Sequence, residues 1–294
     1  MAVPWTDEER ALHHVHEAQP PAVRRGLRVL WHRFAPHVDA DLRARTGRFG
    51  TFVIFAGYPS SGHTLVGSIL NSHPKCVIAN ELDAMFYLHN GVPRDRLVSA
   101  ILRHEVRFDR RNRKNAKGYS YRFPGDRLVD KSGVQVLGDK KGFPTARRFA
   151  KHPWLVETVQ REMGVPIKVV HVVRDPAALL GSFCKSGVSV EMASIRLREM
   201  ANFVCQTRRL FDDKSWHTIH FEDLLTEPRQ TLTRLLAFLD LEADASFLDG
   251  VEPNLFATVP RPDQHQPWST ETADRVRQAN VFDPSFRAYA SAAT

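Results

Sequence analysis

The stretch Thr51–Pro74, TFVIFAGYPSSGHTLVGSILNSHP, decides the fold. Its first part, Phe52–Ala56, is a continuous apolar run that ends at a glycine, which predicts a strand buried on both faces. Gly57–Thr64 is a small, turn-rich loop, and apolar residues then return at helical spacing in Leu65–Leu70. Strand, glycine-bounded loop and helix together predict a phosphate cradle, because loop N–H groups and the helix dipole converge there.

The loop has the spacing of a Walker A motif, except that His63 stands where a lysine is expected. That lysine normally reaches the β- and γ-phosphates of a nucleoside triphosphate. A chain that keeps the cradle without the lysine is expected to bind a different anion. A plain glycine turn is the alternative, and the apolar patterns on both sides of the loop disfavour it.

The composition is that of a globular protein. Of the 294 residues, 43% are hydrophobic and 25% are charged, enough for one large α/β domain, or two small ones, with a substantial core. No run approaches the roughly 18 uncharged apolar residues of a membrane helix, and the polar N-terminus is unlike a signal peptide. Cys76, Cys184 and Cys205 are widely spaced and odd in number, which predicts reduced thiols and a cytoplasmic location.

Further apolar runs predict strands at residues 76–79, 134–137, 168–173 and 216–220. Helical patterns alternate with them, which predicts a mostly parallel central sheet flanked by helices in a single α/β domain over residues 49–294. Residues 1–48 are expected to form a helical extension. The longest helix is expected near 190–211, with a buried stripe of Met192, Ile195, Phe203, Val204 and Leu210.

Polar residues follow several of these strands. Gly57, Glu81, Lys140 and Arg174 each lie just past a predicted strand end. Ligands of parallel sheets bind at the carboxyl ends of the strands, so these residues are expected to share one edge.

The net charge of +8 is concentrated in residues 94–127, where eleven basic residues face four acidic ones. Such a patch attracts nucleic acid, an acidic membrane or an anionic small molecule. A solvated surface segment is the alternative interpretation.

Three motifs, in this order, resemble the sulfotransferases. GYPSSGHT at residues 57–64 resembles the family's loop for the 5′-phosphosulfate of 3′-phosphoadenosine 5′-phosphosulfate (PAPS). VVHVVRDPAALLGS resembles its 3′-phosphate motif, in which Arg174 is followed eight residues later by Ser182. HTIHFEDLLTEPRQTLTRLLAFLDLE resembles the strand and helix that follow, and GDKKG supports the match. The resemblance covers roughly residues 50–290 and implies a fold like that of the P-loop-containing nucleotide hydrolases.

The resemblance implies metal-independent transfer of a sulfuryl group from PAPS to a hydroxyl or amine. The acceptor is open: a small molecule, a carbohydrate or a glycolipid. PAPS needs two anion sites, and an arginine with a serine hydroxyl suits the second. The implied cofactor-binding residues are Ser60, Ser61, Gly62, His63, Thr64, Leu65, Arg174, Ser182 and Arg261, the last in a late basic loop.

Three residues are expected to carry the chemistry. Glu81 is the expected base, because several branches of the family place a glutamate there, and Asp83 is the reserve. Lys140, beside Lys141, is expected to stabilise the leaving group. His63 is expected either to donate a hydrogen bond to the bridging oxygen or to cap the helix.

The loop departs from the family pattern at Ser60, where members usually carry Lys or Arg. The source of the missing positive charge is therefore open between His63 and Lys140. The basic segment 94–127 lies between cofactor motifs and is expected to be an acceptor-side lid, with Tyr119, Tyr121 and Phe123 stacking on the acceptor or packing the lid down.

Three other readings remain. A P-loop kinase or NTPase requires Mg²⁺-dependent ATP binding, which His63 in place of Lys disfavours. A non-catalytic nucleic-acid-binding protein requires steeply salt-dependent affinity, and no recognised nucleic-acid module is visible. A sulfotransferase fold without activity is the third.

Overall fold

The structure is a computed structural model. It describes residues 48–110, 113, 121–128, 131–185, 187–258, 276–277 and 284–291, together with residues 29, 30, 33, 34 and 44. The predicted helical extension over residues 1–48 therefore lies almost wholly outside the described residues. Arg261 and Tyr119 lie outside them as well.

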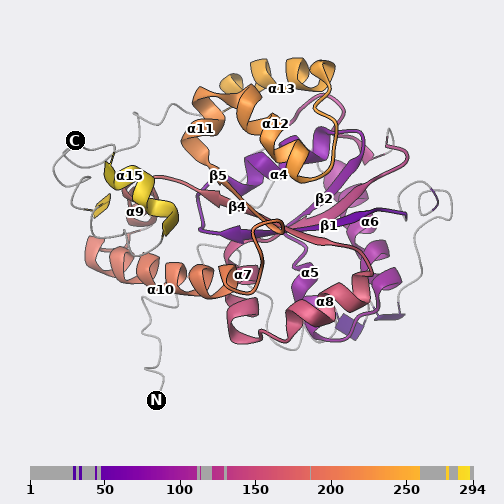
Figure 1. Ribbon diagram of the computed structural model, residues 1–294, viewed down its shortest axis with the longest axis horizontal. Helices are drawn as coiled ribbons and strands as arrows, with labels where there is room; N and C mark the ends of the chain where they lie inside the picture. The colour runs from indigo at the N-terminus through magenta and orange to yellow at the C-terminus, as the bar shows by residue number, and fades with distance from the viewer. Residues whose placement is uncertain are drawn as a thin grey trace.

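Within the described residues, five parallel strands form one sheet in the order β2-β3-β1-β4-β5 (Figure 1). Their bounds are β1 Thr51–Gly57, β2 Cys76–Asn80, β3 Val136–Lys140, β4 Ile167–Val173 and β5 Trp216–His220. The sequence predicted all five, and the single α/β domain with a parallel sheet is confirmed. The central strand β1 is buried along its whole length, as its continuous apolar run predicts.

Helices cover both faces of the sheet (Figure 1). One face carries α4 His63–Ser72, α11 Phe221–Thr226, α12 Pro228–Phe238 and α13 Ala245–Thr258. The other carries α5 Ala84–His89, α6 Arg94–Arg110, α7 Gly142–Lys151, α8 Leu155–Met163 and α10 Val190–Arg208. Helices α9 Pro176–Cys184 and α15 Arg287–Ser291 lie near the carboxyl ends of β4 and β5.

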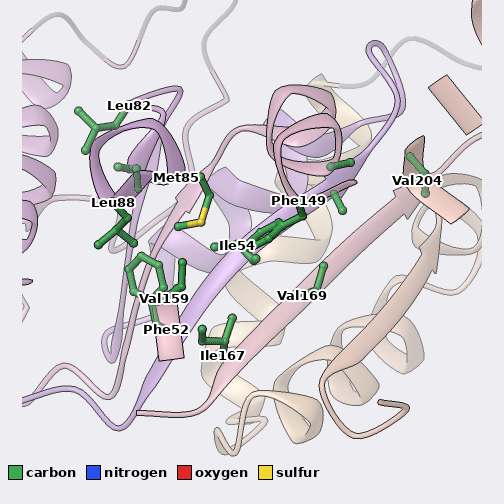
Figure 2. Packing of buried hydrophobic residues seen from close by; sticks show 14 of the residues in the cluster. Phe52, Ile54, Leu82, Met85, Leu88, Phe149, Val159, Ile167, Val169 and Val204 are labelled. Atoms are coloured by element: carbon green, nitrogen blue, oxygen red, sulfur yellow. The ribbon is translucent and has the colours of Figure 1, made fainter. Parts of the chain in front are cut away.

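Alternating side chains of β1 divide the core into two clusters. Phe52 and Ile54 point to the face of α5, α7 and α8, where they pack with Phe149 and Val159 (Figure 2). Val53 and Phe55 point to the opposite face and pack with α4, α12 and α13. The sheet is thereby held rigidly from both sides, and its carboxyl edge is a fixed platform.

Strand β3 differs from the sequence prediction, which ended it at Leu137. It continues to Lys140, because Gly138 lies inside the strand rather than after it. A Cβ atom on Gly138 would lie 2.4 Å from the carbonyl oxygen of Val53, so glycine is needed for the close approach to β1. The extension places Asp139 and Lys140 on the strand itself and fixes their directions.

The buried stripe predicted for α10 is confirmed at Val204 and wrong at Ile195, which is 54% exposed, while Met192, Phe203 and Leu210 are only partly buried. Small residues let α10 pack closely against α7 and α9. The buried positions are Ala193, Arg196, Leu197, Ala201, Val204 and Thr207.

The described part of the basic segment packs into the fold, and its predicted role as an acceptor-side lid stays a prediction. Helix α6 packs its apolar side, including Leu97 and Ile101, into the first core cluster. Arg113 is buried in ion pairs with Glu105, at 2.9 Å, and with Asp109. A Cβ on Gly125 would lie 2.7 Å from the carbonyl oxygen of Ser72, at the end of α4 remote from the loop.

Candidate functional site

The loop between β1 and α4 turns sharply at two residues with left-handed backbone. Ser60 has φ 66° and Gly62 has φ 100°. Gly62 has no substitute here, because a Cβ would lie 2.3 Å from the Phe221 ring. Among the described residues, no side chain caps α4 and no acidic residue stands in its first turn. The N–H groups at the start of α4 are therefore suited to an anion, as the sequence predicted.

The imidazole ring of His63 is buried between the loop and the end of β1. Its Nε2 is 2.9 Å from the carbonyl oxygen of Ala56, and its Nδ1 is 2.9 Å from the hydroxyl of Ser61. Burial is the main cause that lowers the pKa of His63 to about 4, so the ring is neutral at pH 7. Cβ atoms on Gly57 or Gly142 would lie 2.9 Å from this ring. Both ring nitrogens of His63 are thus engaged by Ala56 and Ser61, which ties the loop to the end of β1.

Lys140 brings positive charge to the loop from the neighbouring strand β3. Its Nζ donates to Thr64 Oγ1 at 3.1 Å and also pairs with the carboxylate of Glu81. The side chain is 3% exposed, and its stem passes over Gly67 of α4. Lys141 Nζ contacts the other carboxylate oxygen of Glu81 at 2.6 Å. The ammonium group of Lys140 therefore lies beside the first turn of α4, the place that the loop lysine serves in a Walker A motif.

Glu81 lies between the two lysines. Burial of its carboxyl favours the neutral form, but the ion pairs with Lys140 and Lys141 outweigh it and lower the pKa to about 2. Its backbone has φ 68°, and its N–H donates to the carbonyl of Lys140 at 3.0 Å. Asp83 instead pairs with Arg148, whose Nη2 is 3.1 Å from both carboxylate oxygens. Glu81, not Asp83, is thus the carboxylate beside Thr64.

Asp139 supports this turn, and the sequence reasoning missed it. Its carboxyl oxygens accept from the N–H of Leu82 at 3.0 Å and of Ala84 at 2.7 Å. Burial chiefly raises the pKa of Asp139 to about 7. The early end predicted for β3 hid this residue, because it left Asp139 in a loop. Its position opposite Ile54 in the parallel register fixes it below the turn.

Arg174 and Ser182 meet the loop at its other end. Arg174 Nη1 donates to the carbonyl of Ser60 at 3.3 Å, and the Ser182 hydroxyl donates to Ser60 Oγ at 2.9 Å. The Arg174 guanidinium also lies over the Phe221 ring, 4.9 Å from its centroid. Ser60 is therefore the point where the two predicted phosphate motifs touch, although more than one hundred positions separate them in the sequence.

Asp175 has a structural task in this arrangement. Its Oδ1 accepts from the N–H of Ala177 at 2.9 Å and so caps α9.

Among the described residues, no three His, Cys, Asp or Glu side chains gather as a metal site would require. No helix in that part of the chain is long and apolar enough to cross a membrane.

Comparison with known proteins agrees with the motifs. The sequence model of the sulfotransferase family matches residues 52–245. No curated protein matches the sequence. Solved structures similar to the chain include the sulfotransferase domain of the Synechococcus PCC 7002 olefin synthase, at 16% identity, covering 75% of this chain and 88% of that one with a TM-score of 0.44. A sulfotransferase from Alicyclobacillus acidocaldarius has 16% identity, covering 83% and 95%, also with a TM-score of 0.44.

The family match spans well over half of the chain and includes β1, the loop, Lys140, Arg174 and Ser182. The chain belongs to the sulfotransferase family.

Proposed function

We propose that this protein transfers a sulfuryl group from PAPS to a hydroxyl or amine without a metal ion. One observation carries the proposal: Arg174 and Ser182 both bind Ser60, in the same loop that leads into the start of α4 and Lys140. PAPS carries a 5′-phosphosulfate and a 3′-phosphate on one ribose. Two anion sites joined by one short loop match that distribution of charge.

The residues divide into two groups. The N–H groups of the loop and of Thr64, with the Lys140 ammonium, suit the 5′-phosphosulfate. The Arg174 guanidinium and the Ser182 hydroxyl suit the 3′-phosphate. Lys140 supplies the charge that Ser60 lacks, and His63 holds the loop from below. Arg261 remains a proposed contact from the late basic loop.

The transfer step uses Glu81 and Lys140. The acceptor oxygen or nitrogen attacks sulfur, the bond from sulfur to the 5′-phosphate oxygen breaks, and the acceptor proton passes to the Glu81 carboxylate. Lys140 stabilises the negative charge that develops on the leaving phosphate oxygen. A carboxyl with a pKa of about 2 is a weak base while both lysines pair with it. A phosphosulfate that shares those lysines raises the pKa of Glu81 and strengthens it as a base.

The acceptor belongs to one of three classes: a small molecule, a carbohydrate or a glycolipid. We also propose a cytoplasmic location, which the three free cysteines favour because thiols stay reduced there.

Calorimetric titration tests the proposal. Adenosine 3′,5′-bisphosphate, the desulfated product, is titrated into the protein in EDTA, with ATP and Mg²⁺ in a parallel experiment. We expect micromolar binding of the bisphosphate without metal and its loss in Arg174→Ala. Arg229→Ala is the matched control, since Arg229 pairs with Asp249 and Glu252 on the exposed surface. Binding of ATP with Mg²⁺, and none of the bisphosphate, overturns the proposal in favour of a kinase.

A further inference from the structure

Arg277, close to the C-terminus, forms a two-pronged ion pair with Asp175. Its Nε lies 3.2 Å from Oδ1 and 3.1 Å from Oδ2, and its Nη2 lies 2.6 Å from Oδ2. The two side chains are 19% and 13% exposed, so the pair is largely shielded from water. Asp175 directly follows Arg174 in the sequence. The C-terminal segment therefore reaches the predicted 3′-phosphate site from outside the three recognised motifs.

A second carboxylate, that of Glu222, is held at the same turn by hydrogen bonds. Glu222 Oε1 accepts from the backbone N–H of Asp175 at 3.1 Å, and Glu222 Oε2 accepts from the hydroxyl of Tyr289 at 2.5 Å. The same hydroxyl lies 3.2 Å from Nδ1 of His220. Two C-terminal side chains, Arg277 and Tyr289, thus engage the two carboxylates that flank the turn between β4 and α9.

The segment also packs against the loop itself. The Phe286 ring is fully buried and lies 4.9 Å from the ring of Tyr58, measured between centroids. This contact fixes the short turn around Phe286 relative to β1. Val276, the residue before Arg277, is buried in the same core cluster as Tyr58, so apolar packing also holds the ion pair with Asp175 in place.

The electrostatics give Arg277 a defined task. A carboxylate next to Arg174 repels a phosphate bound there and competes for the guanidinium, unless another cation neutralises it. A residue without a capping side chain at position 175 would leave α9 uncapped, and α9 is the helix that carries Ser182. Arg277 removes the charge conflict while leaving the cap in place. A phosphate at Arg174 and Ser182 then meets net positive charge.

We propose that Arg277, by neutralising and holding Asp175, is a positioning residue for the 3′-phosphate site formed by Arg174 and Ser182. The inference rests on the proposed function, which assigns the 3′-phosphate to this pair. Arg277 acts through Asp175 and does not itself bind the nucleotide. Tyr289 supports the same turn through Glu222.

The test compares two nucleotides that differ only in the 3′-phosphate. Adenosine 3′,5′-bisphosphate and adenosine 5′-monophosphate are titrated into the wild type, Arg277→Ala, Arg277→Lys, Asp175→Asn and the double variant Asp175→Asn with Arg277→Ala. We expect Arg277→Ala to weaken the bisphosphate about tenfold or more, because Asp175 then carries an unneutralised like charge near the phosphate. Binding of the monophosphate is expected to stay near the wild-type value. Arg277→Lys should recover part of the loss.

The double variant separates the proposed role from direct binding. Asn caps helices as well as Asp does, so Asp175→Asn removes the charge and keeps the cap. We expect the double variant to regain most of the affinity that Arg277→Ala loses. Tyr289→Phe is a second, milder variant with the same expected direction, and Arg229→Ala is the control.

Three outcomes contradict the inference. Equal losses for both nucleotides in Arg277→Ala would show a general effect on the fold. A double variant as weak as Arg277→Ala would show that Arg277 contacts the nucleotide directly. Unchanged bisphosphate binding in Arg277→Ala would remove its role altogether. A wild type that binds both nucleotides equally overturns the proposed function itself, which keeps the two failures distinct.

Discussion

Replacing Lys140 by Met tests whether β3 supplies the charge that the loop lacks. Methionine keeps the apolar stem that passes over Gly67 and removes only the ammonium group. That group donates to Thr64 Oγ1 at 3.1 Å and pairs with Glu81. The variant therefore changes the electrostatics at the start of α4 with little change in packing.

The magnitude follows from the distances. At a separation of about 4 Å, a phosphate oxygen and the ammonium would attract by about 4 kcal/mol at an effective dielectric constant near 20. Lys141 stays beside Glu81, at 2.6 Å, and the helix N-terminus remains, so about half of that energy should be lost. A loss of about 2 kcal/mol corresponds to about 30-fold weaker binding of adenosine 3′,5′-bisphosphate.

The assay is calorimetric titration of the wild type and Lys140→Met at low salt in EDTA, with urea unfolding to confirm that both are folded. Lys151→Met is the matched control, because Lys151 is an exposed residue at the end of α7. Binding by Lys140→Met within about threefold of the wild type, with a normal unfolding midpoint, would refute the assignment of this charge to the nucleotide site.

Three further predictions follow from the same geometry. Glu81→Gln should lower turnover by about 10²- to 10⁴-fold while bisphosphate affinity is retained, and a loss below about tenfold in steady-state kinetics would remove Glu81 as the base. Gly62→Ala should destabilise the fold by about 1–3 kcal/mol in urea unfolding, since φ is 100° and the new Cβ would meet Phe221. Stability should fall as the pH drops below 6.5. Burial chiefly lowers the pKa of His63 to about 4 and that of His171 to about 3, so the unfolded chain binds protons in this range that the folded chain does not. Asp139, whose pKa burial raises to about 7, works in the opposite direction, but it is one group against two. Equal urea midpoints at pH 7 and pH 5 would contradict this account.

The central part of the fold could be predicted because its signals are local. The apolar run of β1, the glycine-bounded loop and the helical spacing after it lie within one short stretch. Arg174 and Ser182 are joined by a fixed spacing along one strand and helix, and could be identified in the same way. Such patterns need no knowledge of distant contacts.

Other parts of the site depend on contacts between distant segments. The pairing of Lys140 with Thr64 follows from the parallel register of β3 beside β1, which no local pattern reveals. The sequence pattern predicts that the strand ends before Gly138, although this glycine is a point of close backbone approach inside the strand. His63 had two open roles, and only the positions of Ala56 and Ser61 show that its ring lies under the loop.

The contacts that Arg277 makes near the C-terminus leave even less signal in the sequence. Arg277 lies far from every recognised motif in the sequence, and its ion pair with Asp175 spans about one hundred positions. An isolated arginine in a polar segment gives no indication of its partner. The stripe of α10 was predicted correctly only at Val204 for a related reason, because contacts with distant helices bury Ala193 and Ala201 as well as large apolar residues.

The central claim is that one short loop joins two anion sites, one at Lys140 and one at Arg174. The most direct test titrates adenosine 3′,5′-bisphosphate, the 3′-monophosphate and the 5′-monophosphate into the wild type, Lys140→Met and Arg174→Ala. We predict that Arg174→Ala loses the contribution of the 3′-phosphate and keeps that of the 5′-phosphate, and that Lys140→Met shows the reverse. If each variant weakens all three nucleotides by the same factor, the two residues do not serve separate phosphates, and the account is wrong.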